Sequence, residues 1–299
     1  MRKLLVLALA AFALAGCGGD DATGEEATSG LAVPWVNPDG EPPYIGSIDV
    51  NPADEAIFMG TNTGLFRIPE GGAEPEKLTG TLSTPDGEGN VSESLVATFT
   101  GPDTLIASGH PAEGAALPPA LGLIRSEDGG RTWSSVSELG TADFHALEIS
   151  GDTLVGALFG QSQVLVSTDE GRTWEARTAP MPLVDLAVDP TDADRWIGTT
   201  ETGIFLTEDG GGSWRQRDPT PNVRVAWDAG GDLYRIDPGG YLKVSTNGGD
   251  SWEDRGTTGG EPHALTVAED GTVYAALLDG AIKASDDGGQ TFTDRVAGG

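Results

Sequence analysis

The sequence predicts an all-β fold, a six-bladed β-propeller with four strands in each blade, over residues 44–299. Two observations carry this prediction. An eight-residue pattern, Ser/Thr-x-Asp/Asn-x-Gly-x-Thr/Ser-aromatic, recurs at intervals of 38 to 41 residues, which suits one four-stranded blade. Each interval also contains four short runs rich in β-branched and aromatic residues, and none of these runs has a helical period.

Five copies of the pattern are clear, and one is degenerate. The degenerate copy, Gly64 to Gly72, aligns with Gly203 to Gly211 and supplies the first blade. A seventh blade would need residues 31–43, where four prolines argue against paired strands. The five clear copies begin at Ser126, Ser167, Thr207, Ser245 and Ser285.

The repeated segment resembles the Asp-box, or bacterial neuraminidase repeat, of sialidase-like β-propellers. The resemblance implies that each copy forms the turn between the third and fourth strands of a blade. In such a turn the acidic side chain accepts backbone N–H groups, glycine adopts a positive φ, and the aromatic ring packs between sheets. We therefore expect structural rather than catalytic roles at Asp128, Asp169, Asp209, Asn247 and Asp287.

The amino-terminal residues predict export and lipid anchoring. Residues 1–16 read as a signal peptide, because two basic residues precede an apolar run that is too short to span a bilayer. The run ends in Leu14-Ala-Gly-Cys17, which resembles the lipobox of bacterial lipoproteins and implies cleavage before a lipidated Cys17, the only cysteine. Residues 17–43 are expected to form the lipidated cysteine and a flexible acidic tether. The predicted location is the cell envelope, outside the cytoplasm.

The charge of the chain limits its partners. With 47 acidic and 17 basic residues, the net charge is −30, so nucleic acid and anionic lipid headgroups are repelled. We expect contact with the membrane through the lipid anchor only, a monomer, and no cofactor or bound metal.

Two insertions indicate which face of the propeller binds a ligand. In the Asp-box family the repeated turn lies opposite the usual ligand site. The opposite face, here called the long-loop face, carries the connections between blades and those between strands two and three. Residues 79–94 and 108–122 lengthen two neighbouring connections, which we expect on this face. They are either functional loops or tolerated insertions.

All three histidines map to the long-loop face. His145 and His263 occupy matching phrases in two repeats, which favours a structural role, although ligand binding stays open. His110, His145 and Asp143 could converge near blades 2 and 3 and bind a metal or a polar ligand. Because two histidines without a fixed spacing are poor evidence for a metal, none is predicted.

Two arginines replace small residues of the other repeats. Arg224 and Arg235 are expected near the propeller axis with Tyr241, on the long-loop face. There they would either bind an anionic ligand or form an ion pair between blades, for which Asp185 is the expected partner.

Catalytic residues are harder to find. Phe66-Arg-Ile-Pro69 spells the FRIP motif of sialidases, but the repeat register places Arg67 at the wrong end of the third strand, so true sialidase activity is not expected. A glycosidase usually needs two carboxylates about 5–10 Å apart beside the scissile bond. The candidates on the long-loop face are Asp143, Glu113, Asp86 and Glu93.

The chain as a whole resembles bacterial Asp-box lipoproteins of the sialidase-like, glycosyl hydrolase-like superfamily. Relatives with such propellers include glycosidases, photosystem assembly factors and sorting receptors, so the resemblance implies no single activity. We predict a lipid-anchored module that binds a glycan or protein at the long-loop face, with ligand contacts from His110, His145, Arg224, Arg235, Tyr241 and His263. The alternative is a glycoside hydrolase of the same superfamily.

Overall fold

The computed structural model describes residues 43–71, 74–85, 87–91 and 93–298. The predicted signal peptide, Cys17, nearly all of the tether, and Asp86 lie outside these residues. Throughout the described part of the chain the regular structure is β-strand. No helix among the described residues is long and apolar enough to cross a membrane.

The strands form six sheets, each with a four-stranded antiparallel blade. Blade 1 contains β1 (Ile45–Val50), β2 (Ile57–Thr61), β3 (Gly64–Ile68) and β4 (Glu76–Leu78). Blade 2 contains β7 (Glu93–Gly101), β8 (Thr104–His110), β9 (Leu123–Ser126) and β10 (Thr132–Ser137). Blade 3 contains β11 (Phe144–Ser150), β12 (Thr153–Leu158), β13 (Gln163–Ser167) and β14 (Glu175–Thr178).

The remaining blades repeat the same order. Blade 4 contains β15 (Asp185–Asp189), β16 (Asp192–Thr200), β17 (Gly203–Thr207) and β18 (Arg215–Asp218). Blade 5 contains β19 (Arg224–Trp227), β20 (Leu233–Ile236), β21 (Tyr241–Ser245) and β22 (Glu253–Thr257). Blade 6 contains β23 (Pro262–Val267), β24 (Val273–Leu277), β25 (Ile282–Ser285) and β26 (Thr293–Val296).

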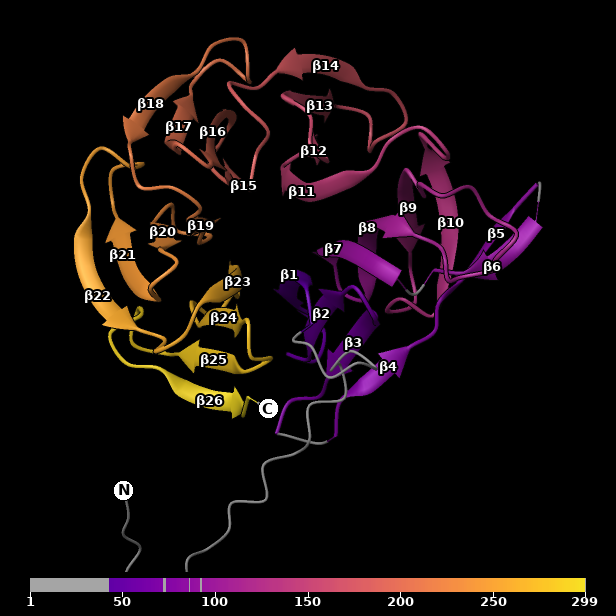
Figure 1. Cartoon of the computed structure of the whole chain (residues 1–299), viewed down its shortest axis with the longest axis horizontal. Helices are drawn as coiled ribbons and strands as arrows, with labels where there is room; N and C mark the ends of the chain where they lie inside the picture. The colour runs from indigo at the N-terminus through magenta and orange to yellow at the C-terminus, as the bar shows by residue number, and fades with distance from the viewer. Residues whose placement is uncertain (1–42, 72–73, 86, 92, 299) are drawn as a thin grey trace, which may run out of the picture. The chain divides into compact units, whose positions relative to one another are not determined.

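The blades are arranged in a ring, and the first strand of each blade lies next to the central axis (Figure 1). The predicted six-bladed β-propeller is therefore confirmed. The strands alternate in direction, so every first strand begins at the long-loop face, and the turns between strands three and four lie at the other end.

The first insertion is a hairpin rather than a surface loop. Its strands β5 (Thr81–Thr84) and β6 (Gly87–Asn90) extend the outer edge of blade 2, where β5 pairs in parallel with β10. The expectation that residues 79–94 lengthen the long-loop face is therefore wrong for the paired part of this segment. The two insertions still meet, because Ala112 donates its N–H to the Asn90 carbonyl.

The repeated segments form nearly identical turns, here called the repeat turns, between the third and fourth strands. In blade 3 the Asp169 carboxylate accepts the backbone N–H of Thr173 at 2.9 Å and its hydroxyl at 2.7 Å. The Ser167 hydroxyl donates to Asp169 and accepts the N–H of Gly171. Equivalent contacts surround Asp128, Asp209, Asn247 and Asp287.

Gly171 cannot be replaced without strain. Its φ is +81°, and a Cβ atom there would lie 2.1 Å from a methyl group of Leu123 in the preceding blade. The repeat turn therefore places its backbone directly against the neighbouring sheet.

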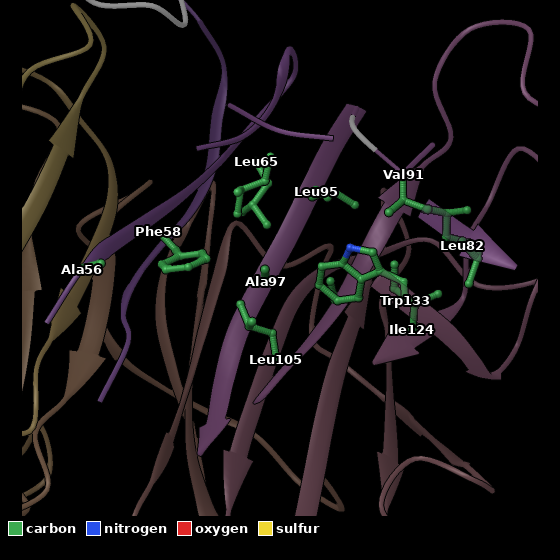
Figure 2. Close-up of a cluster of buried hydrophobic side chains, with 13 residues drawn as sticks. Ala56, Phe58, Leu65, Leu82, Val91, Leu95, Ala97, Leu105, Ile124 and Trp133 are labelled. Atoms are coloured by element: carbon green, nitrogen blue, oxygen red, sulfur yellow. The ribbon is translucent and has the colours of Figure 1, made fainter. Parts of the chain in front are cut away.

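Buried apolar side chains join the blades. Six apolar clusters each combine residues of two adjacent blades. Figure 2 shows the cluster between blades 1 and 2, with Phe58 and Leu65 of blade 1 beside Leu105 and Trp133 of blade 2. Full burial of one such side chain is worth about 1.5–3 kcal/mol. The aromatic residue of each repeat turn packs against the preceding blade, namely Trp133, Trp174, Trp214, Trp252 and Phe292.

Blades 1 and 6 close the ring without a shared sheet. In some β-propellers one blade combines strands from the two ends of the chain. Here strands β1 to β4 form one blade and strands β23 to β26 form another, each from a contiguous segment. The apolar cluster between them includes Ile45, Phe66, Tyr274 and Ile282. The Ile45 N–H also donates to Nδ1 of His263 at 3.3 Å, so the imidazole of blade 6 bonds the first strand.

The carboxylates of the repeat turns make the stability of the fold depend on pH in acidic solution. The N–H and hydroxyl groups of Thr173, with the Ser167 hydroxyl, lower the pKa of Asp169 to about 2 from 3.8. The stabilisation by this carboxylate is complete above the unfolded-state pKa and is lost as the pH falls through about 2. We expect Asp169→Asn to have a lower Tm than the native protein near neutral pH, with the difference shrinking from about pH 4 to pH 2.

Thermal melts followed by circular dichroism measure this difference. Asparagine is compatible with the turn geometry, because Asn247 holds the same position in blade 5 with the same backbone contact. A difference in Tm that stays constant between pH 6 and pH 2 would contradict the assignment of the effect to the carboxylate charge.

Candidate functional site

A central pocket of about 280 Å³ lies on the propeller axis. It is lined by the first strands of all six blades, β1, β7, β11, β15, β19 and β23. Tyr44, His145, Arg224 and His263 line it near the starts of these strands, so they mark its opening on the long-loop face.

Four acidic residues line this pocket, and three of them, Asp49, Glu148 and Asp185, each accept an N–H group of the next blade. Asp49 accepts the N–H of Phe99 at 2.8 Å, and Asp185 accepts the N–H of Val225 at 3.0 Å. Glu148 likewise accepts the N–H of Val188. These carboxylates therefore join blade 1 to 2, blade 4 to 5 and blade 3 to 4.

The surroundings of these acids oppose ionisation. Burial raises the pKa of Glu148 well above 4.5, and the charges of Asp185 and Asp49 raise it further. The hydrogen bond from the Val188 N–H lowers this pKa and opposes the shift only in part. Burial also raises the pKa of Asp185, although the Arg224 charge and two backbone N–H groups oppose the shift. The pKa of Asp49 is raised by burial as well. All three side chains are half-buried by surface area, because the surface they expose faces the pocket itself.

Arg224 is the cationic group of the pocket. Its Nη1 donates to the Val184 carbonyl at 2.7 Å, and its charge acts on Asp185. Its buried Nε has no hydrogen-bond partner among the described residues. The charge of Arg224 therefore acts on Asp185, but the two side chains form no direct ion pair in the described part of the chain, and one N–H of the guanidinium is left without an acceptor.

Arg235 and Tyr241 do not join Arg224, contrary to the prediction. Arg235 is buried between blades, where its guanidinium lies 2.8 Å from Asp218 and 4.5 Å from the centre of the Trp252 ring. The ion pair between blades is present, but its acid is Asp218 rather than Asp185. Tyr241 begins β21 and is 62% exposed on the long-loop face, outside the pocket lining.

His263 serves both the ring closure and the pocket. Besides accepting the Ile45 N–H, it lies with its ring centre 5.8 Å from that of Tyr44. Burial lowers the pKa of His263 below 6.5, and the Arg224 charge lowers it further. The charge of Glu261 raises this pKa and opposes the shift only in part. The imidazole is therefore neutral near pH 7, as its role as an acceptor requires.

His110, Asp143 and His145 converge, as the repeat register predicts. Asp143 Oδ2 lies 3.5 Å from Nε2 of His110 and 3.5 Å from Nε2 of His145. His110 ends β8, Asp143 precedes β11, and His145 is the second residue of β11. The His145 ring stacks on Phe159 with the ring centres 4.1 Å apart.

Of the other catalytic candidates, Glu93 of β7 lies opposite His110 of β8, whereas Glu113 is placed apart from this group. Glu113 lines a separate hollow with Thr81 and Glu88, between the two insertions. Arg67 is paired with Asp54 of the β1–β2 turn, at the repeat-turn end of blade 1. The sequence register therefore locates the arginine of the FRIP motif correctly, away from the pocket opening.

Exposed apolar side chains gather on one face. Among the described residues, three large apolar side chains are exposed, Tyr44 at 47%, Phe159 at 62% and Tyr241 at 62%. Tyr44 precedes β1, Phe159 follows β12, and Tyr241 begins β21, so all three lie on the long-loop face. Exposed aromatic residues confined to one face are typical of a binding surface.

Sequence reasoning missed Asp49, Glu148 and Phe159. Glu148 lies opposite Val155 and Asp49 opposite Phe58, one residue after the positions that pair with Gly156 and Met59. The two acids therefore share one position of the repeat. An alignment of the first strands in this register reveals two acids at a position where the other blades carry small or hydroxyl residues.

No family model matches the chain. Among curated proteins, the oligoxyloglucan-reducing end-specific xyloglucanase of Emericella nidulans is 25% identical over 160 residues, which cover 40% of this chain and 20% of the enzyme. The chain thus spans a fifth of that relative.

Solved structures that resemble the propeller include the following two. YCF48 bound to a D1 peptide has 16% identity and a TM-score of 0.53, covering 85% of this chain and 82% of YCF48. An ancestral GH74 enzyme has 15% identity and a TM-score of 0.53, covering 87% of this chain and 39% of the enzyme. The structural neighbours are β-propeller proteins. At these identities the likeness shows the fold alone.

Proposed function

We propose that the chain is a lipid-anchored binding module of the cell envelope, and that it holds a protein segment or a glycan at the long-loop face. The observation that carries this proposal is that Tyr44, Phe159 and Tyr241 are exposed on one face, the face on which the central pocket opens beside Tyr44. Aromatic side chains supply much of the contact energy in protein interfaces, since each buries a large area with few rotatable bonds.

The pocket adds a polar anchor to this surface. Arg224 presents its guanidinium at the opening of the pocket. A carboxylate or carbonyl group of a ligand would pair with this guanidinium. The comparisons support a protein ligand, since one structural neighbour is described with a bound D1 peptide and another in a nidogen–laminin complex.

Photocrosslinking tests the proposed face. We expect a benzophenone amino acid placed at Phe159 or at Tyr241 to yield a discrete covalent adduct in cells of the source organism. The same amino acid at Arg172, an exposed residue of a repeat turn, is the matched control and should yield none. Mass spectrometry of the adduct identifies a protein, and a glycan array probed with the purified chain covers the other ligand class. Equal adducts from both faces would contradict the proposal.

The proposed anchor rests on the lipobox-like segment that ends at Cys17. We expect Cys17→Ser to move the chain from the membrane fraction to the soluble fraction, because the serine hydroxyl cannot replace the acylated thiol. Immunoblots of the two fractions measure the change, with the native chain as control. Retention of the variant with membranes would overturn the anchoring proposal and leave the ligand proposal standing.

A glycoside hydrolase is the second candidate, and the pocket acids favour it. The raised pKa of Glu148 suits a general acid, and Asp185 and Asp49 are further carboxylates in the same pocket. The xyloglucanase match and the GH74 neighbour are compatible with this activity. Asp143, the earlier candidate, lies between two histidines instead.

The two candidates are separated by the Glu148→Gln variant. Glutamine keeps an acceptor for the Val188 N–H and removes a charge that burial disfavours. Since the pKa of Glu148 is raised, the native protein loses stability as pH rises above about 4.5, so the variant should melt no lower than the native protein at pH 7. We expect neither protein to release the aglycone from a panel of aryl glycosides. Turnover by the native protein that falls at least a hundredfold in the variant would favour the hydrolase.

A further inference from the structure

We propose that His110, Asp143 and His145 form a binding site for a divalent transition metal of the zinc class, at the edge of the long-loop face. Their ligand atoms all lie within 4.8 Å of one another. Neutral imidazole nitrogen and carboxylate oxygen are ligands that zinc accepts in proteins.

The hydrogen bonding of His110 prepares it for a metal. Its Nδ1 lies 2.6 Å from the carbonyl oxygen of Pro119. A carbonyl oxygen only accepts, so Nδ1 carries the proton, and in the neutral ring Nε2 has a free lone pair. That lone pair faces Asp143. Histidines that bind metals commonly donate their other ring N–H to a carbonyl oxygen, which fixes the tautomer and the ring orientation.

The spacing of the three groups suits one ion. With metal–ligand bonds of about 2.0–2.1 Å, two ligands of a tetrahedral zinc lie about 3.3–3.4 Å apart. Asp143 Oδ2 lies 3.5 Å from each histidine Nε2, close to this ligand–ligand distance. When both rings carry their proton on Nδ1, two nitrogen lone pairs and an anionic oxygen face one another, and they repel unless a cation lies among them.

The supporting groups hold this arrangement in place. His145 lies on the rigid strand β11 and stacks on Phe159, while the Phe159 N–H donates to the Asp143 carbonyl. Asp143 Oδ1 is buried and has no hydrogen-bond partner in the described part of the chain. A carboxylate oxygen without a partner is stabilised by a nearby cation.

Three protein ligands leave a fourth tetrahedral position free. The side chains of His110, His145 and Asp143 are 40%, 30% and 24% exposed, so this position is open to water or to a group of a bound ligand. The net charge of −30 favours the approach of a cation. This inference does not depend on the proposed binding of a protein or glycan.

Isothermal titration of zinc chloride into the purified full-length chain, without a polyhistidine tag, tests the site. We expect one zinc per chain, and at least a tenfold loss of affinity in His110→Ala, His145→Ala and Asp143→Asn. Asp152→Asn is the matched control, because Asp152 is an exposed acid of the β11–β12 turn, at the other end of the same blade and outside the cluster, and it should keep the native affinity. Absorption of bound Co²⁺ reports four-coordinate geometry.

A second measurement needs no variant. Diethylpyrocarbonate modifies accessible imidazoles, and peptide mass spectrometry locates the modified residues. We expect zinc to protect His110 and His145 and to leave the reactivity of His263 unchanged. Magnesium, which prefers oxygen ligands, should protect none of them. Absence of zinc binding near pH 7.5, or binding and protection that do not involve His110 and His145, would overturn the proposal.

Discussion

No strand pairing joins one blade of this ring to the next within the described residues, and the rest of the structure follows from that constraint. Adjacent first strands diverge around the axis, so contacts other than a continuous sheet must hold the blades together. Apolar clusters provide most of these contacts, one at each junction between blades. Backbone N–H groups at the inner edge still need acceptors, because a buried unpaired N–H is unfavourable.

Acidic side chains supply such acceptors at three of the junctions between blades, and the same side chains line the central pocket. Asp49, Glu148 and Asp185 each reach the backbone of the next blade, and their carboxylates come together near the axis. The charge of Arg224 offsets part of their mutual repulsion. The same groups thus hold the ring together and line the pocket.

The two faces of the propeller carry different kinds of side chain, and we propose that only one of them binds a ligand. The repeat turns form one face, where carboxylates such as Asp169 accept N–H groups of their own turn and remain ionised. The long-loop face carries the exposed aromatic side chains and the cluster around Asp143. In a chain with 47 acidic residues, the acids of the repeat turns are committed to turn geometry, and the aromatic, histidine and arginine side chains that we propose as ligand contacts lie on the second face.

The sequence by itself determined the fold, because the repeat states the same local rule five times: a hydroxyl, an acid, a glycine and an aromatic residue at fixed spacing make the same turn wherever they occur. The repeat register also assigned faces, so the meeting of His110 with Asp143 and His145 was predictable. Other features depended on side-chain direction and packing across blades. Arg235 turns into a junction between blades and pairs with Asp218, and residues 79–94 pair at an outer edge. Only the tertiary structure decides such contacts, because they depend on which residues of different blades lie close together in space. A local sequence pattern does not contain this information.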